Sequence, residues 1–404
     1  MMQEYVKGSP IFTNINNTDR QYKYLTKNIE TDVLVVGGGV TGAICAYYLT
    51  KNNINTTLIE KGRIGHLSTS VTTSLLQYEL DDNLSELTEA LCLKDAIKAY
   101  KLGLKALDEI ENFINDYGNF CDYIKRDTLL YTSKQSEIKG IESEFKQRKY
   151  HGLNVEYIDK SNNPYSFDLK AGIISKNGGA EIDPYKFTNQ LIEVSQRNGL
   201  NVYENTEAKT INYTNDGVEI ETCYGYRIKA KKVIAATGYN TTLFTKRNFA
   251  TKYNTFNIAT KPIESIQGWK DNVLIRDNCD PYNYLRTTVD NRMIIGGEDV
   301  EFKYIDDNKL AQEKYEILEQ RLKSMFKDVK NIEIEYKYCG CFASTKDNLG
   351  FIGPDPKHKN LWYCLGYGAN GILFAILGGI MLSKLYKNEV DEDMRLFEIS
   401  RFDN

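Results

Sequence analysis

The chain has 404 residues, of which 41% are hydrophobic and 26% charged, so it can bury a full core and is long enough for two lobes. Its formal net charge of −4 offers no basic surface for a phosphate backbone, which argues against a nucleic-acid partner. The N-terminal sequence MMQEYVKGSPIFTNINNTDR lacks the regions of a signal peptide, and the most apolar stretch, 371–382, is too short to span a membrane. We therefore expect an uncleaved cytoplasmic chain with no membrane partner and a buried helix at 371–382.

The eight cysteines show no repeated spacing of the kind that marks a disulfide framework or a zinc site. The closest pair, Cys339 and Cys341, would point to the same face of a strand, but the chain has only three histidines to complete a metal cluster. We therefore expect buried free thiols and no metal site.

The first strong element is an apolar run at 32–36 that ends in three glycines and predicts a buried strand. A helix is predicted at 43–49 and a second strand at 55–60, because residues 56–59 are rich in β-branched and aliphatic side chains. Together these three elements predict a βαβ unit.

The elements that follow are less regular. Apolar residues at steps of three and four predict a long amphipathic helical region from 84 to 114. The later predicted elements are short strands and polar turns between 120 and 170, a helix from Pro184 to Asn198-Gly199, a strand at 201–203, a hairpin around Asn215-Asp216-Gly217 and a buried strand at 232–237.

Residues 250–338 combine β-rich segments, including a strand at 292–297, with one polar helix at 308–325. The remainder returns to a strand, a glycine loop and an apolar helix. This order predicts a discontinuous cofactor lobe formed by 1–100, 170–250 and 339–404. The second lobe, formed by 101–169 and 251–338, is then inserted into it.

The glycines of Val35-Val-Gly-Gly-Gly-Val-Thr-Gly42 fit the pattern G-x-G-x-x-G between a strand and a helix. Gly37 permits the tight turn, Gly39 lets a pyrophosphate approach the backbone, and Gly42 brings the helix close to the strand, while the helix start, with Val40 and Thr41, attracts phosphate. Glu60, 23 residues after Gly37, is placed to hold ribose hydroxyls. The alternative is a glycine-rich turn beside a surface glutamate.

This fingerprint does not distinguish FAD from NAD. The segment from Asp32 to Gln77, with GGGVTG followed by IEKGRIGHLSTSVTTSLLQ, resembles the D-amino-acid oxidase and glycine oxidase superfamily of FAD enzymes. The resemblance implies an α/β fold in which a Rossmann-like FAD-binding domain of the glutathione-reductase type carries an inserted antiparallel β-sheet substrate domain. It also implies that the loop after the acid follows the pyrophosphate and flavin, through Lys61, Ser68, Thr69, Ser70 and Thr73. A solvated Ser/Thr loop is the alternative.

Three later segments fit the same resemblance. Residues 202–208 are similar to the family strand that meets the adenine, which implies a backbone contact from Ala208. Thr237 and Gly238 resemble the family's small-residue turn beside the dinucleotide, although a plain strand end is an alternative. The loop 366–372 resembles the last glycine loop, whose amides approach the flavin carbonyl; the residues implied there are Gly368, Asn370, Gly371 and Ile372.

The chain departs from the family pattern at positions that bear on the substrate. An arginine that forks onto the substrate carboxylate in amino-acid-oxidising members is replaced by Phe342, and a lysine of sarcosine-oxidase relatives is replaced by Leu373. This departure argues against recognition of a free α-amino acid, while the resemblance still implies an amine or amino-acid-like substrate. The histidine that carries flavin in some relatives matches Val71, and the corresponding cysteine position of others falls near Gly340, which the resemblance implies as a cofactor contact. We expect noncovalent FAD.

One cation in the inserted lobe remains well placed to meet the substrate, Arg286. Alternation places Tyr282, Tyr284 and Arg286 on one face of a strand, where we expect the tyrosines to enclose an amine and Arg286 to meet an anionic group. The alternative is core tyrosines with a surface arginine. Lys346 is predicted either to assist at the flavin or to form an ordinary ion pair with the adjacent Asp347.

The resemblance implies an oxidoreductase that takes a hydride from the carbon next to an amine nitrogen onto flavin N5. The resulting imine would hydrolyse, and dioxygen or another acceptor would take the electrons. Two alternatives stay open: an NAD-dependent dehydrogenase, which would not explain the Ser/Thr and C-terminal glycine loops, and a flavin-bearing binding or assembly protein without turnover.

Overall fold

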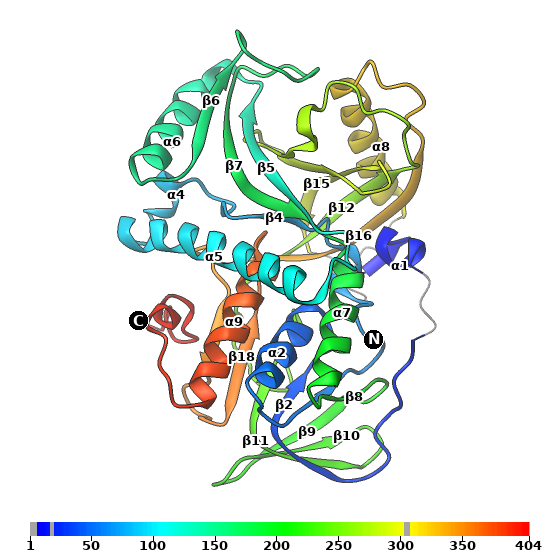
Figure 1. Cartoon of the computed structure of the whole chain (residues 1–404), viewed down its shortest axis with the longest axis vertical. Helices are drawn as coiled ribbons and strands as arrows, with labels where there is room; N and C mark the ends of the chain where they lie inside the picture. The colour runs from blue at the N-terminus through cyan, green and yellow to red at the C-terminus, as the bar shows by residue number, and fades with distance from the viewer. Residues whose placement is uncertain (1–5, 17–19, 303–307, 404) are drawn as a thin grey trace.

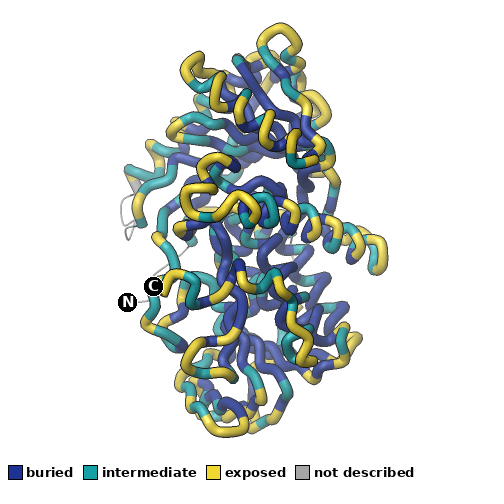
Figure 2. The backbone as a smooth tube through the Cα atoms, turned by 90° about the vertical axis from the view of Figure 1, so that its left-hand side faces the viewer, coloured by how far each residue is buried: buried dark blue, intermediate teal, exposed yellow. Residues whose placement is uncertain are grey.

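The computed structural model describes residues 6–16, 20–302 and 308–403 and has two sheets, one in each lobe of an elongated molecule (Figure 1). Parts of the N-terminal segment that was predicted to remain uncleaved, 1–5 and 17–19, lie outside the described residues. Figure 2 shows buried backbone running through both lobes and exposed backbone mainly at loop ends. The fold is therefore the predicted α/β arrangement of two lobes.

The smaller sheet has a parallel core that begins with the predicted βαβ unit. Its strands run in the order β17, β18, β11, β2, β3, β8, with all neighbours parallel except β17 and β18, and β10 and β9 extend it from β11 as antiparallel strands. Their bounds are β2 Ile29–Val36, β3 Thr56–Ile59, β8 Asn201–Tyr203, β9 Ala208–Tyr213, β10 Val218–Thr222, β11 Arg227–Ala235, β17 Phe351–Pro354 and β18 Leu361–Leu365. The predicted hairpin around Asn215 is the turn from β9 to β10.

Apolar helices cover this sheet. α2 (Val40–Lys51) and α9 (Gly371–Tyr386) are buried along most of their length and pack against each other, which explains why neither shows an amphipathic pattern. α7 (Pro184–Arg197) packs on α2, and α5 (Leu93–Tyr117) crosses the molecule between the two lobes (Figure 1). In the described residues, no helix combines the length and hydropathy that a membrane crossing requires.

The larger sheet belongs to the other lobe. Its order is β1, β16, β12, β15, β14, β13, β5, β7, β4, with β6 paired to β7, and its pairs are antiparallel except for β13 with β5. The bounds are β1 Val6–Gly8, β4 Leu75–Gln77, β5 Ile124–Thr132, β6 Val155–Asp159, β7 Ala171–Glu181, β12 Thr251–Thr260, β13 Leu274–Asp277, β14 Asn283–Thr287, β15 Met293–Glu301 and β16 Ile334–Ser344. The remaining helices are α1 Ile11–Ile15, α3 Ser68–Val71, α4 Leu84–Leu87, α6 Ile138–Tyr150 and α8 Asn308–Met325, with 3₁₀ turns at Gln135–Glu137, Lys270–Asn272 and Glu392–Phe397.

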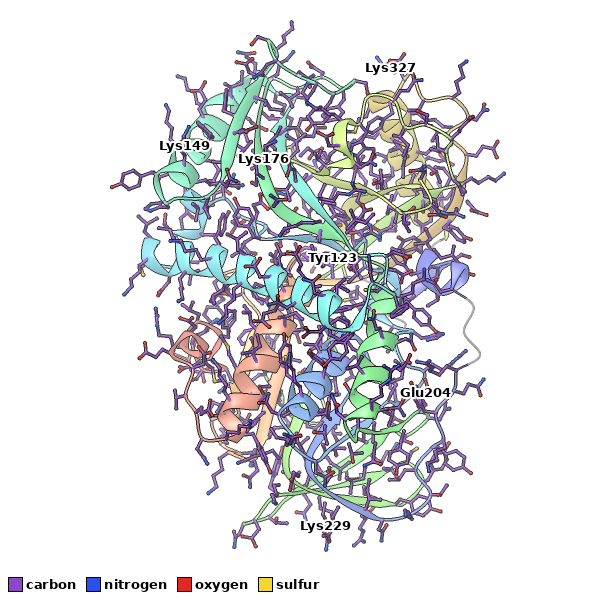
Figure 3. The ribbon with its side chains drawn as sticks, in the orientation of Figure 1. Tyr123, Lys149, Lys176, Glu204, Lys229 and Lys327 are labelled. Atoms are coloured by element: carbon purple, nitrogen blue, oxygen red, sulfur yellow. The ribbon has the colours of Figure 1, made fainter. Side chains whose placement is uncertain are left out.

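Helix α6 corrects the prediction of short strands and turns between 120 and 170. Its inner face contributes Ile141 together with a buried ion pair, Glu144 to Arg148, in which Nε donates at 2.6 Å. Arg148 also pairs with Glu79, while Lys149 lies exposed on the same helix (Figure 3). A helix that buries charge where an apolar stripe is expected has no apolar period of 3.6, so its sequence looks like a polar connection.

The predicted domain boundaries stay a proposal, which the two sheets refine. β4 and β7 lie inside the ranges predicted for the cofactor lobe, 1–100 and 170–250, yet both belong to the larger sheet. Most of α5 falls inside 101–169, which was predicted for the second lobe, but it packs on α9. We therefore propose that the chain crosses between the lobes at the ends of these elements.

Candidate functional site

A cavity of about 570 Å³ runs from the first βα turn of the smaller sheet to the inner face of the larger sheet. Its walls come from the glycine turn after β2, the loop around α3, the ends of β9 and β11, the loop before α9, and strands β12 to β16. The cavity therefore joins the segments predicted to bind the cofactor to the tyrosines predicted to face the substrate.

The first βα turn is built from glycines that leave no room for a side chain. Gly37 has φ +117°, and a Cβ there would lie 2.4 Å from the carbonyl oxygen of Ala236. A Cβ at Gly42 would lie 1.8 Å from the carbonyl oxygen of Gly37, so Gly42 allows α2 to pack on the turn but does not itself line the cavity. Gly39, Val40 and Thr41 line it, at the positive end of the α2 dipole.

Glu60 closes β3 beside this turn. Its carboxylate accepts N–H groups of Gly38 at 2.7 Å and Gly62 at 2.8 Å, and it lines the cavity together with Lys61. Burial raises the pKa of this carboxyl, against the effect of the two backbone donors. Glu204 at the end of β8, labelled in Figure 3, accepts the N–H of Ile64 at 2.7 Å and so fixes the loop that follows Glu60.

The Ser/Thr loop lies along the next part of the cavity. Thr69 Oγ1 accepts the N–H of Val40 at 3.0 Å, which ties the loop to the start of α2, and Ser68 and Thr73 line the cavity beside it. Ser70 does not line it, because its hydroxyl donates to the carbonyl of Leu67 within the turn of α3. This corrects the prediction for Ser70.

The opposite wall comes from two other predicted segments. Ala208 starts β9, and Thr237 and Gly238 follow β11; all three line the cavity. Gly238 has φ +56°, and a Cβ added there would meet no atom within 4 Å, so its backbone faces open space. Tyr367 donates its hydroxyl to the Gly238 carbonyl at 2.9 Å, linking this turn to the C-terminal loop.

The C-terminal glycine loop completes the elongated part of the cavity. Gly368, Asn370, Gly371 and Ile372 line it at the start of α9. Asn370 Nδ2 donates to the carbonyl of Gln77 at 2.7 Å, while its Oδ1 is buried without a hydrogen-bond partner in the described structure. The loop is therefore held against β4, at the far end of the Ser/Thr loop.

These residues fit FAD. Four buried side-chain atoms around the cavity have no hydrogen-bond partner in the part of the chain that the structure describes: Ser74 Oγ, Thr237 Oγ1 and Asn370 Oδ1 along the dinucleotide segments, and Asp299 Oδ1 on the wall of the larger sheet. Buried polar atoms are rarely left unpaired in native proteins, so a polar ligand along this path is expected. The positions that depart from the family pattern, Val71, Phe342 and Leu373, also line the cavity, and none can form a covalent flavin link. Cys341 lines it too, but burial raises the pKa of its thiol to about 12, which disfavours the thiolate.

The far wall of the cavity belongs to the larger sheet and carries a connected set of polar side chains. Tyr282 donates its hydroxyl to Asp299 Oδ2 at 2.6 Å, and the Tyr284 hydroxyl lies 2.6 Å from Thr255 Oγ1. The two rings are 6.1 Å apart between centroids. Gly296, opposite Tyr284 in the register of β14 with β15, leaves space for that ring, since a Cβ there would lie 2.2 Å from it. Burial raises the pKa of both phenols, so they remain hydrogen-bond donors.

Arg276 and Asp81 connect this wall to the C-terminal loop. Arg276 is the cross-strand partner of Tyr284, and its Nη1 donates to the carbonyls of Leu80 and Asp81. Asp81 Oδ2 accepts the N–H of Ala369 at 3.3 Å, and both charged residues line the cavity. Burial raises the pKa of Asp81, partly offset by the positive charge of Arg276.

The structure does not bring Arg286 to this cavity, which corrects the prediction. Arg286 does lie on the same strand face as the tyrosines, but a strand advances about 3.3 Å per residue, so the face continues beyond the cavity. There the side chain is buried over the ring of Phe12, 5.2 Å from its centroid, and its Nη1 donates to the carbonyl of Ser74. It lines a smaller cavity of about 250 Å³ instead.

Two further predicted residues lie elsewhere. Lys346 is exposed and stacks on Phe402, while Asp347 is paired with Arg401, whose Nε donates at 2.8 Å, so both roles predicted for Lys346 are wrong. Gly340 lies within β16, paired with Val6 and Thr255, and does not line the cavity.

Sequence reasoning missed Asp81, Arg276 and Asp299. Asp81 lies four residues after the end of β4 and could have been identified from the acid pair at 81 and 82. Arg276 and Asp299 could not, because their positions depend on which strands pair and on a register shift between β12 and β15 near Thr255. Such irregularities redirect side chains, and they are frequent beside active sites.

Comparison with known proteins agrees with this geometry. A family model described as FAD dependent oxidoreductase (DAO) matches residues 32–385. YhfW of Bacillus subtilis (strain 168), provisionally named a Rieske 2Fe-2S iron-sulfur protein, is 26% identical over 99% of this chain and 77% of its own, and the glycine oxidase of the same organism is 23% identical over 92% and 97%. The crystal structure of glycine oxidase from Geobacillus kaustophilus superposes with a TM-score of 0.79 at 19% identity, covering 92% of this chain and 99% of that one. The chain therefore belongs to the FAD-dependent oxidoreductase (DAO) family.

Proposed function

We propose that this oxidoreductase oxidises a C–N bond of an amine held against the wall of Tyr282, Tyr284, Asp81 and Asp299. The observation that carries the proposal is the continuity of the cavity: one space is lined by the dinucleotide segments and by this polar wall. FAD, when bound, supplies the hydride acceptor for the carbon next to the nitrogen. We propose noncovalent FAD. Val71 occupies one of the family's attachment positions, and the thiol near the other, Cys341, stays protonated because burial raises its pKa to about 12.

The chain itself orients the amine and controls its proton. The nitrogen lone pair must be free for hydride to leave the adjacent carbon, so the ammonium form has to lose a proton. Asp81, which contacts the C-terminal loop through Ala369, is placed to accept that proton. Tyr284 and Tyr282 enclose the substrate and exclude water, and the imine product hydrolyses after release from this pocket.

The wall also argues against a free α-amino acid as substrate. Phe342 occupies the position of the family's carboxylate-binding arginine and lines the cavity. Arg276 carries a positive charge nearby, but its Nη1 is already engaged by two backbone carbonyls. We therefore propose an amine without a carboxylate next to the reacting carbon.

The test is anaerobic mixing of FAD-loaded protein with a panel of primary and secondary amines, N-methyl amino acids, glycine and D-alanine, followed by flavin absorbance. Bleaching by amines is expected, with little from glycine or D-alanine. Preferential bleaching by α-amino acids would contradict the proposed substrate class, and no bleaching by any amine would favour a binding role without turnover. Reoxidation by dioxygen or by an added dye identifies the acceptor, and cell fractionation tests the predicted cytoplasmic location.

A further inference from the structure

The substrate wall contains more negative charge than the proposed oxidation needs. Two carboxylates, Asp81 and Asp299, and one guanidinium, Arg276, line this part of the cavity. Neither carboxylate has an ion pair within 4.0 Å in the described ranges. A buried charge without a close partner is costly, so such a group in a binding site indicates a ligand of opposite charge.

Asp299 is the less compensated of the two. Burial raises the pKa of Asp299, and two neutral hydroxyls, those of Tyr282 and Thr255, lower it. Its Oδ2 accepts the Tyr282 hydroxyl at 2.6 Å, and its Oδ1 is buried without a hydrogen-bond partner among the residues described. The neighbouring Glu298 adds negative charge, and Lys314, whose positive charge lowers the pKa of Asp299, donates to Glu298 at 2.9 Å. The cations of this neighbourhood are thus engaged by Glu298.

Asp81 differs because a cation of the chain already compensates it. Arg276 is the largest opposing charge near Asp81, and its Nη1 also holds the Asp81 carbonyl at 3.1 Å. Asp81 further accepts the Ala369 N–H from the C-terminal loop, so it lies at the flavin end of the wall. Asp299 and its donor Tyr282 belong to the same wall, with the Tyr282 ring 6.1 Å from the Tyr284 ring between centroids.

We propose that Asp299 binds a second cationic group of the substrate, so that the substrate class is an amine that carries an additional ammonium at some distance from the reacting nitrogen. This inference rests on the proposed amine oxidation. Asp81 takes the reacting nitrogen, and Asp299 takes the distal ammonium through a charge-assisted hydrogen bond supported by Tyr282. Asp299 is then a specificity residue, and it takes no part in hydride transfer.

Three secondary amines of similar length test the charge preference: N-methylputrescine, N-methylpentylamine and ω-(methylamino)pentanoate, which end in an ammonium, a methyl group and a carboxylate. Anaerobic reduction of the FAD-loaded protein is measured as a function of amine concentration. The apparent Kd for the diamine is expected to be at least about tenfold lower than for the other two, because a desolvated charge pair is strongly favourable.

Asp299→Asn removes the charge with little change of shape, and it should bring the apparent Kd values for N-methylputrescine and N-methylpentylamine to within about twofold of each other, because the charge pair that favours the diamine is lost. Glu301→Gln removes the same charge from the exposed end of the same strand, outside the cavity, and should keep the preference. FAD content and the thermal unfolding midpoint establish that each variant is folded. If Asp299→Asn does not fold, the apparent Kd values of the wild-type protein for the three amines still test whether the site prefers a second ammonium.

Equal apparent Kd values for the three amines, or preference for the carboxylate, would overturn the inference while amine oxidation stands. Retained diamine preference in folded Asp299→Asn would overturn it as well. Failure of all three amines to reduce the flavin would overturn both the inference and the proposed function, so the two failures are distinguishable.

Discussion

Asn370 and Gln77, 293 positions apart in the chain, are joined by a hydrogen bond of 2.7 Å from the Asn370 side-chain amide to the Gln77 carbonyl. The bond fixes the loop before α9 against the end of the Ser/Thr loop, so the two segments predicted to enclose the flavin form one wall. The other side of the Asn370 amide, Oδ1, remains unpaired in the described structure and is available to the cofactor.

Replacement of Asn370 should weaken FAD binding. Asn370→Ala leaves the buried Gln77 carbonyl unpaired and removes Oδ1, at a cost of about 1–3 kcal/mol, so the Kd for FAD should rise about tenfold or more. Titration of apoprotein with FAD, followed by flavin fluorescence, measures this change. Asn198→Ala, at the exposed end of α7, makes the same chemical change away from the cavity and should leave the Kd unaltered.

The packing of the first βα turn gives a second prediction. Gly42→Ala would place a Cβ 1.8 Å from the Gly37 carbonyl, so α2 must shift and the free energy of unfolding should fall by about 2 kcal/mol or more. Gly140→Ala, on the exposed face of α6 with nothing within 4 Å of the new Cβ, should instead raise the free energy of unfolding by about 0.5–1 kcal/mol. Urea unfolding of both variants checks the pair; equal effects of the two substitutions would contradict the close packing of α2 on the turn.

Replacement of Arg276 should mainly slow flavin reduction, whereas replacement of Arg286 should mainly reduce stability. Arg276→Met removes the cation beside Asp81 and releases the Leu80 and Asp81 carbonyls, so flavin reduction by an amine should slow about tenfold or more. Arg286→Met should mainly lower the free energy of unfolding, because Arg286 is buried over the ring of Phe12 and lines the smaller cavity. Stopped-flow reduction and urea unfolding of both variants measure this. Slower flavin reduction in Arg286→Met, with an unchanged rate in Arg276→Met, would contradict this assignment and support the substrate-binding role predicted for Arg286 from the sequence.

Asp183, the N-cap of α7, provides a pH-dependent prediction. Burial raises the pKa of its carboxyl to about 6, against an unfolded value of about 3.9. A raised carboxyl pKa means that the folded state binds the proton more tightly, so this group's contribution of up to about 3 kcal/mol is present below pH 4 and lost as pH rises to about 6. Asp183→Asn keeps the cap but does not titrate. The wild-type free energy of unfolding, minus that of the variant, should therefore fall between pH 4 and 6.

Asp95 is the control of opposite sign. Its exposed ion pair with Arg395 lowers the pKa of the Asp95 carboxyl. The corresponding difference for Asp95→Asn should be small and should rise with pH, because the charged form is the stabilised one. A flat difference curve for Asp183→Asn would show that this carboxyl is not perturbed by burial.

The cofactor half of the site could be predicted from the sequence because its signals are local. Gly37, Gly39 and Glu60 lie within one βαβ unit, where a strand, a turn and a helix follow each other and the roles of the residues depend on short spacings. The same holds for the loop at 366–372, which precedes an unmistakably apolar helix. The error at Ser70 is also local in origin, since alternate hydroxyls of a short helical turn face opposite sides.

The substrate half depends on contacts that no short segment encodes. Alternation correctly placed Tyr282, Tyr284 and Arg286 on one face, but it could not tell where along β14 the cavity ends. Arg276 takes the place expected for Arg286 because β13 pairs with β14 in a register that puts it opposite Tyr284. Helix α6 escaped prediction for a related reason, since its inner face is stabilised by an ion pair with a partner 69 residues away, Glu79.

The most direct test of the central claim is a single anaerobic turnover in which flavin absorbance and carbonyl product are quantified together. The continuous cavity predicts that FAD-loaded protein mixed with an accepted amine forms one equivalent of aldehyde or ketone for each equivalent of flavin reduced. Protein that binds FAD stoichiometrically, yet shows no reduction by any amine, or reduction without a carbonyl product, would contradict C–N oxidation at this site.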